Sequence, residues 1–169
     1  MVGDVVVAAC AAAVVVRVVV VGVQIEVVEQ VTDEVVTAFE RLLPQLSRSA
    51  PALDAAALGA VAHFPGNHLL VARLDGEIVG TLTLVTFPIP TGLRAWIEDV
   101  VVDEAGRGTG VGAQLTQAAI RLAHAAGART VDLTSRPSRE AANRLYERLV
   151  SRCATRRSTD SLISHRSDP

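Results

Sequence analysis

Apolar and polar residues alternate along the chain in a way that predicts a mixed α/β domain beginning at residue 23. Segment 23–31 alternates as a strand. Apolar side chains at spacings of three and four follow Thr32, which predicts a helix with Thr32 as its N-cap. Pro44 is expected to end or kink this helix. A shorter helix is predicted over 54–63.

The next part of the chain predicts an antiparallel hairpin. Segments 68–74 and 77–87 alternate as strands and flank Asp75-Gly76, a dipeptide that tight hairpin turns prefer. Segment 88–92 contains two prolines and is expected to be a rigid loop.

A strand, a glycine-rich loop and an amphipathic helix then follow in immediate succession. The strand is predicted over 94–103 and the helix over 110–126. The crossover to the next strand, 129–135, has the length that places two strands parallel. A last helix is predicted over 138–149. The order of elements and the aliphatic composition indicate one α/β (α+β) domain.

The loop Arg107-Gly108-Thr109-Gly110-Val111-Gly112 has the composition of a phosphate site. Its glycines let the backbone approach a ligand closely, and the following helix N-terminus favours negative charge. Arg107 adds a charged donor. A merely tight strand-to-helix turn is the alternative. The dinucleotide fingerprint lacks its final spacing here, and a P-loop would require Gly-Lys-Ser/Thr.

Two adjacent carboxylates precede this loop. Regular strand alternation predicts Glu98 on one face with Trp96, Val100 and Val102, and Asp99 on the other with Ile97 and Val101. A partly buried glutamate suits the removal of a proton from an amine. Glu98 is therefore the first candidate for a base or an amine-orienting group, and Asp99 is the second. A solvated or salt-bridged strand carboxylate is the alternative.

The loop 107–112 matches the Arg/Gln-x-x-Gly-x-Gly/Ala signature of the GCN5-related N-acetyltransferase (GNAT) family, and segment 143–149 resembles the family's late motif. The resemblance covers 23–149, with specific motifs only from Glu98 to Tyr146. It implies a mixed, mostly antiparallel sheet flanked by helices, with a splayed parallel strand pair. It also implies that acetyl-coenzyme A is the co-substrate, with its pyrophosphate on loop 107–112 and its pantetheine on the backbone of Val100, Val101 and Val102.

The same resemblance implies direct transfer of an acetyl group to a primary amine of a small molecule or a protein. Glu98 resembles the family's base, and Tyr146 resembles the tyrosine that protonates the departing thiolate. Tyr146 as a core aromatic is the alternative. Asn143 is expected to reach the pantetheine arm or to cap a neighbour. The other function considered is a non-catalytic acyl-CoA-binding module with a degenerate acceptor site.

Both ends of the chain depart from this pattern. Residues 1–22 form a Val/Ala-rich segment, interpreted as an added strand or helix, a segment translated from upstream of the true start, or a membrane-associating segment. The domain is assigned to 23–150. Residues 151–169 are rich in Arg and Ser and lack the expected Gly-Phe and strand, which predicts a disordered tail and missing or atypical C-terminal strands. A homodimer in which a neighbour supplies a strand is a further hypothesis.

Composition limits the other classes of function. The formal net charge is -2 and the pI is about 6.1, so no basic excess indicates nucleic-acid binding. The twelve uncharged residues 5–16 are too few for a stable membrane span. Cys10 and Cys153 have no metal-ligand spacing, and a reduced, cytoplasmic setting is expected. The acceptor amine itself is not encoded in any motif that we recognise.

Overall fold

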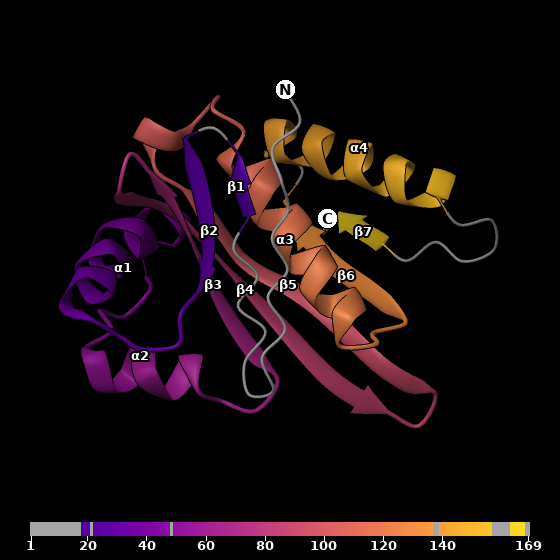
Figure 1. The fold of residues 1–169 in the computed structure, drawn as a ribbon, viewed down its shortest axis with the longest axis horizontal. Coiled ribbons are helices and arrows are strands. Elements are labelled where there is room, and N and C mark those ends of the chain that lie inside the picture. The colour runs from indigo at the N-terminus through magenta and orange to yellow at the C-terminus, as the bar shows by residue number, and fades with distance from the viewer. Residues whose placement is uncertain (1–17, 21, 48, 137–138, 157–162, 168–169) are drawn as a thin grey trace.

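Seven strands, four α-helices and one 3₁₀ helix make up the described part of the chain (Figure 1). The computed structural model describes residues 18–20, 22–47, 49–136, 139–156 and 163–167. In chain order, the elements are β1 (Val18–Val20), β2 (Val23–Val27), α1 (Asp33–Leu46), α2 (Ala55–Ala62), β3 (Asn67–Leu74), β4 (Glu77–Ile89), β5 (Gly92–Val102), η1 (Glu104–Gly106), α3 (Val111–Ala125), β6 (Thr130–Ser135), α4 (Glu140–Arg156) and β7 (Ile163–Ser167).

The strands form one mixed sheet in the order β1-β2-β3-β4-β5-β6-β7. Neighbouring strands from β1 to β5 are antiparallel, whereas β5, β6 and β7 are parallel. The predicted fold class is therefore confirmed, including the parallel pair after the central strand. No helix in the described ranges is long and apolar enough to cross a membrane.

Side chains that alternate along the strands divide the core into two parts, one on each face of the sheet. On β3, Leu69 and Val71 pack with α1 and α2, while Leu70 and Ala72 pack with α3. All four side chains are at most 2% exposed. In Figure 1, α1 and α2 lie together on the left, away from α3 and α4. The helices thus cover both faces of the sheet, as the aliphatic strands require.

The predicted helix starts are confirmed by their caps. The Val35 N–H donates to Thr32 Oγ1 at 3.4 Å, and the Ala57 N–H donates to Asp54 Oδ1 at 2.7 Å. Of the two effects expected of Pro44, the end of the helix is not observed, because α1 continues to Leu46. A proline this close to the C-terminus of a helix removes only one hydrogen bond, and the bonds of the following turn remain.

The hairpin of β4 and β5 is longer than the sequence predicts, and in Figure 1 it extends beyond the helices. Of the predicted loop 88–92, only Pro90 and Thr91 form a turn, and the other three residues belong to the strands. The Thr86 N–H donates to Gly66 O at 2.7 Å, on the β3 side. Pro88, two residues later, directs its nitrogen to the same side, where β3 has already ended at Asn67. No ladder bond is lost there, so proline is tolerated.

The C-terminal segment also differs from its prediction. The sequence indicates a disordered tail over 151–169, but α4 continues to Arg156 and β7 pairs parallel to β6 from Val131↔Ile163 to Ser135↔Ser167. Helix α4 is the crossover that a parallel pair needs, and edge pairing depends on backbone groups rather than on alternating apolar side chains. Residues 157–162 and 168–169 lie outside the described part.

The N-terminal segment contributes one short strand. Val18–Val20 forms β1 and pairs with β2, which fits the interpretation of an added strand for these three residues. Residues 1–17 and 21, on which the other interpretations depend, lie outside the described part.

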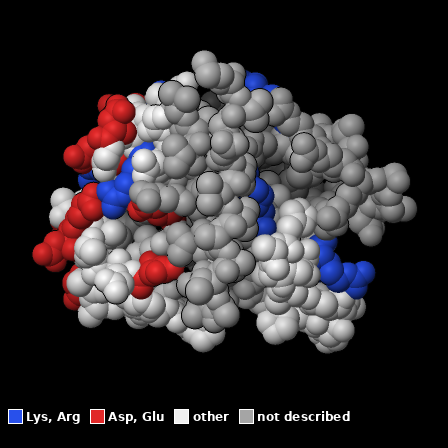
Figure 2. Space-filling view, in the orientation of Figure 1, with Lys and Arg blue, Asp and Glu red and all other residues white. Residues whose placement is uncertain are grey.

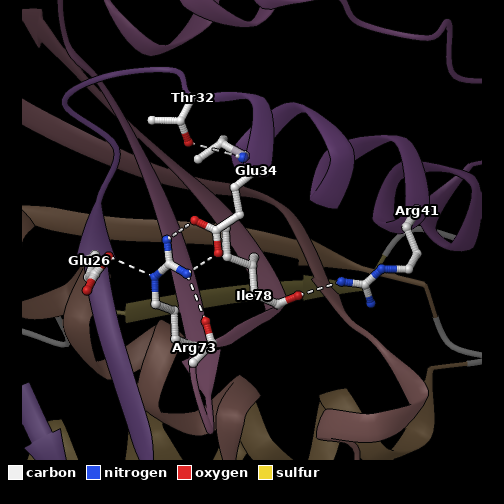
Figure 3. A network of polar contacts seen from close by, with 8 residues as sticks. Glu26, Thr32, Glu34, Arg41, Arg73 and Ile78 are labelled. Atoms are coloured by element: carbon white, nitrogen blue, oxygen red, sulfur yellow. Dashed lines mark hydrogen bonds and ion pairs between the residues drawn. The ribbon is translucent and has the colours of Figure 1, made fainter.

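Arg73 joins four parts of the fold (Figure 3). Its guanidinium donates to Glu26 Oε2 of β2 at 3.1 Å, to both carboxylate oxygens of Glu34 on α1, and to the Gly76 carbonyl at 2.9 Å. Hydrogen bonds from Arg73 lower the pKa of the Glu34 carboxyl. Glu34 lies in the first turn of α1, at the helix end that favours negative charge. Acidic side chains gather on the α1 side of the molecule in Figure 2.

Candidate active site

A β-bulge in the middle of β5 decides which way the predicted site residues face. Thr83 pairs with Glu98, but Thr81 pairs with Val101, so β5 contains one more residue than β4 in this interval. Asp99 takes a positive φ of 51° there.

The predicted regular alternation is therefore wrong from Asp99 onward. Before the bulge, Ile97 belongs to the core beneath α3. After it, Val101 belongs to the core beneath α1, and Val100 and Val102 pack on the α3 side. The extra residue reverses the faces, so Glu98 and Val100 are not on one face as a regular strand would place them.

The central strand and the next one separate just after the bulge begins. β5 and β6 pair from Arg94↔Thr130 to Ile97↔Leu133, whereas β5 continues to Val102. A cavity of about 280 Å³ lies at this separation. It is bounded by the ends of β5 and β6, the end of α1 and the start of α4, and its lining comprises Leu46, Ser47, Ile97, Glu98, Asp99, Val100, Leu133, Thr134, Ser135, Arg136, Arg139 and Tyr146. We call it the acceptor-side cavity.

A second, larger cavity of about 810 Å³ lies beside the glycine loop, and we call it the loop-side cavity. Its lining contains four arginines and one glutamate, together with glycines and aliphatic residues. The full set is Val100, Val102, Gly106, Arg107, Gly108, Gly110, Val111, Gly112, Ala113, Arg139, Glu140, Ala142, Arg144, Leu145, Tyr146 and Arg148. This excess of positive charge suits a ligand with phosphate groups.

The glycine loop leads directly into α3. Gly108 and Gly110 have positive φ angles of 78° and 86°, and a Cβ added to either would meet no atom within 4 Å. Gly110 is the N-cap of α3 and provides no side-chain acceptor to the first turn. The helix therefore begins with N–H groups directed toward an open, glycine-lined space, which is the geometry of an anion site.

The remaining loop residues predicted as ligands have different positions. The Thr109 hydroxyl donates to Gly106 O at 2.7 Å, so it stabilises the loop from within. Arg107 lines the loop-side cavity. Its NH1 lies 3.5 Å from Glu104 Oε1, and its NH2 donates to Gln45 Oε1 at 3.4 Å. Gln45 in turn donates to Asp103 Oδ1 at 3.2 Å, so the end of α1 supports the loop.

Three of the residues predicted for the cofactor line neither cavity: Thr109, described above, Val101 and Asn143. Val101 is 6% exposed and its side chain packs in the α1 core. Asn143 donates from Nδ2 to Arg136 O at 3.1 Å, which holds the turn before α4. This contact corresponds to the capping alternative for Asn143.

The two predicted catalytic residues line one cavity. Glu98 is exposed on β5, and Tyr146 is 5% exposed on α4, and both border the acceptor-side cavity. Burial raises the pKa of the Tyr146 hydroxyl above its usual value, and the positive charge of Arg139 opposes this shift. Tyr146 therefore remains protonated near neutral pH and can act as a proton donor.

Sequence reasoning missed Arg139, which lines both cavities and donates from NH1 to Val100 O at 3.4 Å. It also missed Ser135 and Arg136 in the acceptor-side cavity. A usable signal was present, because these residues follow the carboxyl end of a predicted parallel strand, where ligand sites in open sheets occur.

Comparisons with known proteins agree with this fold and with the family that the motifs resemble. A sequence model described as the acetyltransferase (GNAT) family matches residues 29–150. A protein of known structure from Agrobacterium tumefaciens str. C58, described as an acetyltransferase, is 32% identical, with a TM-score of 0.61 over 67% of this chain and 83% of that chain. No curated protein matches the chain.

Two further solved structures are similar. A transcriptional regulator from Bacillus halodurans C-125 is 30% identical, with a TM-score of 0.62 over 75% of this chain and 91% of that chain. An aminoglycoside acetyltransferase from an uncultured soil metagenomic sample has a TM-score of 0.65 over 87% of this chain and 95% of that chain. The latter is 20% identical, so its likeness shows the fold alone.

Proposed function

Because the chain belongs to the acetyltransferase (GNAT) family, we propose that it transfers an acetyl group from acetyl-coenzyme A directly to a primary amine of a small molecule or a protein. One observation carries the proposal. The loop-side and acceptor-side cavities have Val100, Arg139 and Tyr146 in common. A donor and an acceptor that enter from the two sides would meet at these residues, and such positioning accounts for a large part of catalysis in direct transfer.

The loop-side cavity fits the co-substrate. The N–H groups at the start of α3, the open glycines Gly108 and Gly110, and the arginines that line only this cavity would hold the pyrophosphate. The β5 backbone at Val100 and Val102, which follows the separation from β6, would hold the pantetheine arm. Acetyl-coenzyme A would supply the acetyl group in the activated form of a thioester.

Two side chains of this protein would move protons. Glu98 would accept a proton from the ammonium group of the acceptor, which leaves the free amine that acylation requires. Tyr146 keeps its proton because burial raises its pKa, and it would donate that proton to the leaving sulfur. Direct attack by the amine needs no covalent intermediate on the enzyme.

Calorimetry with acetyl-coenzyme A and with coenzyme A tests the binding part of the proposal. Gly110→Leu should weaken binding at least tenfold, because its side chain would occupy the space proposed for the diphosphate. Gly76→Leu is a matched control, because Gly76 also has a positive φ, of 93°, and open space around a Cβ, but lies in the β3–β4 turn. Unchanged binding by Gly110→Leu would contradict the assignment of the loop.

Thiol release over a panel of primary amines tests turnover. Glu98→Gln and Tyr146→Phe should each lower kcat by roughly 100-fold, the usual contribution of one proton-transfer group, with little change in the affinity for acetyl-coenzyme A. A protein that binds acetyl-coenzyme A but releases no thiol with any amine would instead be the non-catalytic acyl-CoA-binding module.

A further inference from the structure

The acceptor-side cavity contains both signs of charge, grouped by the element that supplies them. Glu98 and Asp99 come from β5, whereas Arg136 and Arg139 come from the connection between β6 and α4. Charged groups in a small cavity favour ligands whose charges are complementary to their own. This grouping fits an acceptor that has a positive group toward β5 and a negative group toward the start of α4.

A buried hydroxyl in the same corner indicates a polar ligand. Ser135 is 7% exposed and lines the acceptor-side cavity, and its Oγ has no hydrogen-bond partner among the described residues. A buried hydroxyl without a hydrogen-bond partner destabilises the fold. An oxygen of a bound ligand would satisfy this group at the point where the two arginines begin.

Hydrogen bonds hold the main chain that carries the two arginines. The Arg139 N–H donates to Arg136 O at 2.9 Å, and Asn143 Nδ2 donates to the same oxygen at 3.1 Å. The contact from Arg139 NH1 to Val100 O, at 3.4 Å, involves one of the five N–H donors of a guanidinium. A carboxylate is the planar anion that such donors bind well.

We infer that the acceptor is a small zwitterion, an amino acid or a close analogue, whose carboxylate is bound by Arg136, Arg139 and the Ser135 hydroxyl while its amine lies toward Glu98. This inference rests on the proposed function and names its substrate class. The cavity volume of about 280 Å³ is near the lower limit for ligand sites, which favours a small molecule over a protein segment. Purely cationic polyamines would place an ammonium group beside two arginines.

The test compares amino acids with their carboxamides, which retain the amine and the shape but lose the negative charge. With acetyl-coenzyme A, the wild type should prefer the acids at least tenfold in kcat/KM. The amine of an amino-acid carboxamide is less basic than the amine of the acid, so a larger fraction of it is unprotonated at the same pH. A preference for the acid therefore cannot result from a larger fraction of free amine. Arg136→Gln and Arg139→Gln should remove most of this preference, mainly through KM. Arg94→Gln is the control, because Arg94 lies on β5 in an ion pair with Asp132 and lines neither cavity.

Equilibrium binding keeps the inference testable even if no acetyl transfer occurs. Calorimetry on the protein saturated with coenzyme A should show binding of an amino acid, weaker binding of its amide, and loss of the difference in Arg136→Gln. Equal binding and equal kcat/KM for acid and amide would overturn the inference, whether or not thiol is released. A second result would also overturn the inference: arginine variants that lose turnover of succinyl-coenzyme A but retain the preference for the acid. The two arginines would then bind the carboxylate of the acyl group and not that of the acceptor.

Discussion

The positive charge of Arg139, the residue just before α4, acts on the buried hydroxyl of Tyr146 on that helix, at the junction of the two cavities. The charge lowers the pKa of this phenol and burial raises it, and burial has the larger effect. The start of α4 thus brings a cation and a proton donor near each other, where the β5 backbone leaves β6.

This relationship can be measured directly because Tyr146 is the only tyrosine in the chain. The tyrosinate absorbance of the folded protein should titrate above pH 10, the approximate value for an exposed tyrosine. Arg139→Gln should raise the pKa of Tyr146 further, whereas Arg94→Gln should leave it unchanged. Because the pKa of Tyr146 is higher in the folded than in the unfolded protein, its protonated hydroxyl should contribute fully to the free energy of unfolding below pH about 10. This contribution should be lost as the pH rises through the folded-state pKa. A normal phenol titration in folded protein would refute the assigned burial.

The bulge residue Asp99 gives a second prediction, because its φ of 51° lies in the left-handed region. Asp99→Ala should decrease the free energy of unfolding by about 1 kcal/mol, since alanine is strained there. Asp99→Gly should be within about 0.5 kcal/mol of the wild type, because glycine adopts this conformation without a steric cost. Chemical denaturation measures both. An alanine variant as stable as the glycine variant would argue against the bulge.

Two glycines with positive φ provide a third prediction, with one as the control for the other. A Cβ at Gly66 would lie 2.2 Å from Thr86 O, whereas a Cβ at Gly76 would meet nothing within 4 Å. Gly76→Ala should cost about 1 kcal/mol of strain. Gly66→Ala should cost roughly 3 kcal/mol or more, because the backbone of β4 must also move. Similar midpoints for the two variants in urea would contradict this close approach of β3 and β4.

The carboxylate of Glu34 gives a prediction about pH. Hydrogen bonds from Arg73 lower its pKa, so its contribution to stability should be present above pH about 4.3 and be lost as the pH falls through the lower folded-state value. Its side chain is 53% exposed, and solvent screening limits the contribution to about 0.3–1 kcal/mol.

Glu34→Gln should therefore decrease the free energy of unfolding at neutral pH and have little effect near pH 2. Glu40→Gln, at an exposed position on the same helix, is the control and should change little at either pH. An equal loss in the Glu34 variant at both pH values would indicate that Arg73 does not act through the charge of this carboxylate.

The local structure and the glycine loop could be predicted from the sequence alone. The caps at Thr32 and Asp54, the turn at Asp75-Gly76 and the run of glycines at 107–112 depend on residues near one another in the chain. Backbone conformation and capping are set over a few residues, so motifs are sufficient to predict them. The same motifs carried the resemblance that made Glu98 and Tyr146 candidate catalytic residues.

The set of side chains that share a cavity follows from the tertiary structure and not from local sequence. The bulge at Asp99 reverses the faces of β5 beyond it. The sequence of β5 alone does not predict the bulge, because a bulge depends on how many residues of β4 pair with the same stretch of β5. Arg139 and Ser135 became candidates because α4 returns across the separation of β5 and β6. The pairing of β7 with β6 likewise depends on an edge that distant residues create. Register and cavities arise from contacts between elements far apart in sequence, and local propensity does not encode them.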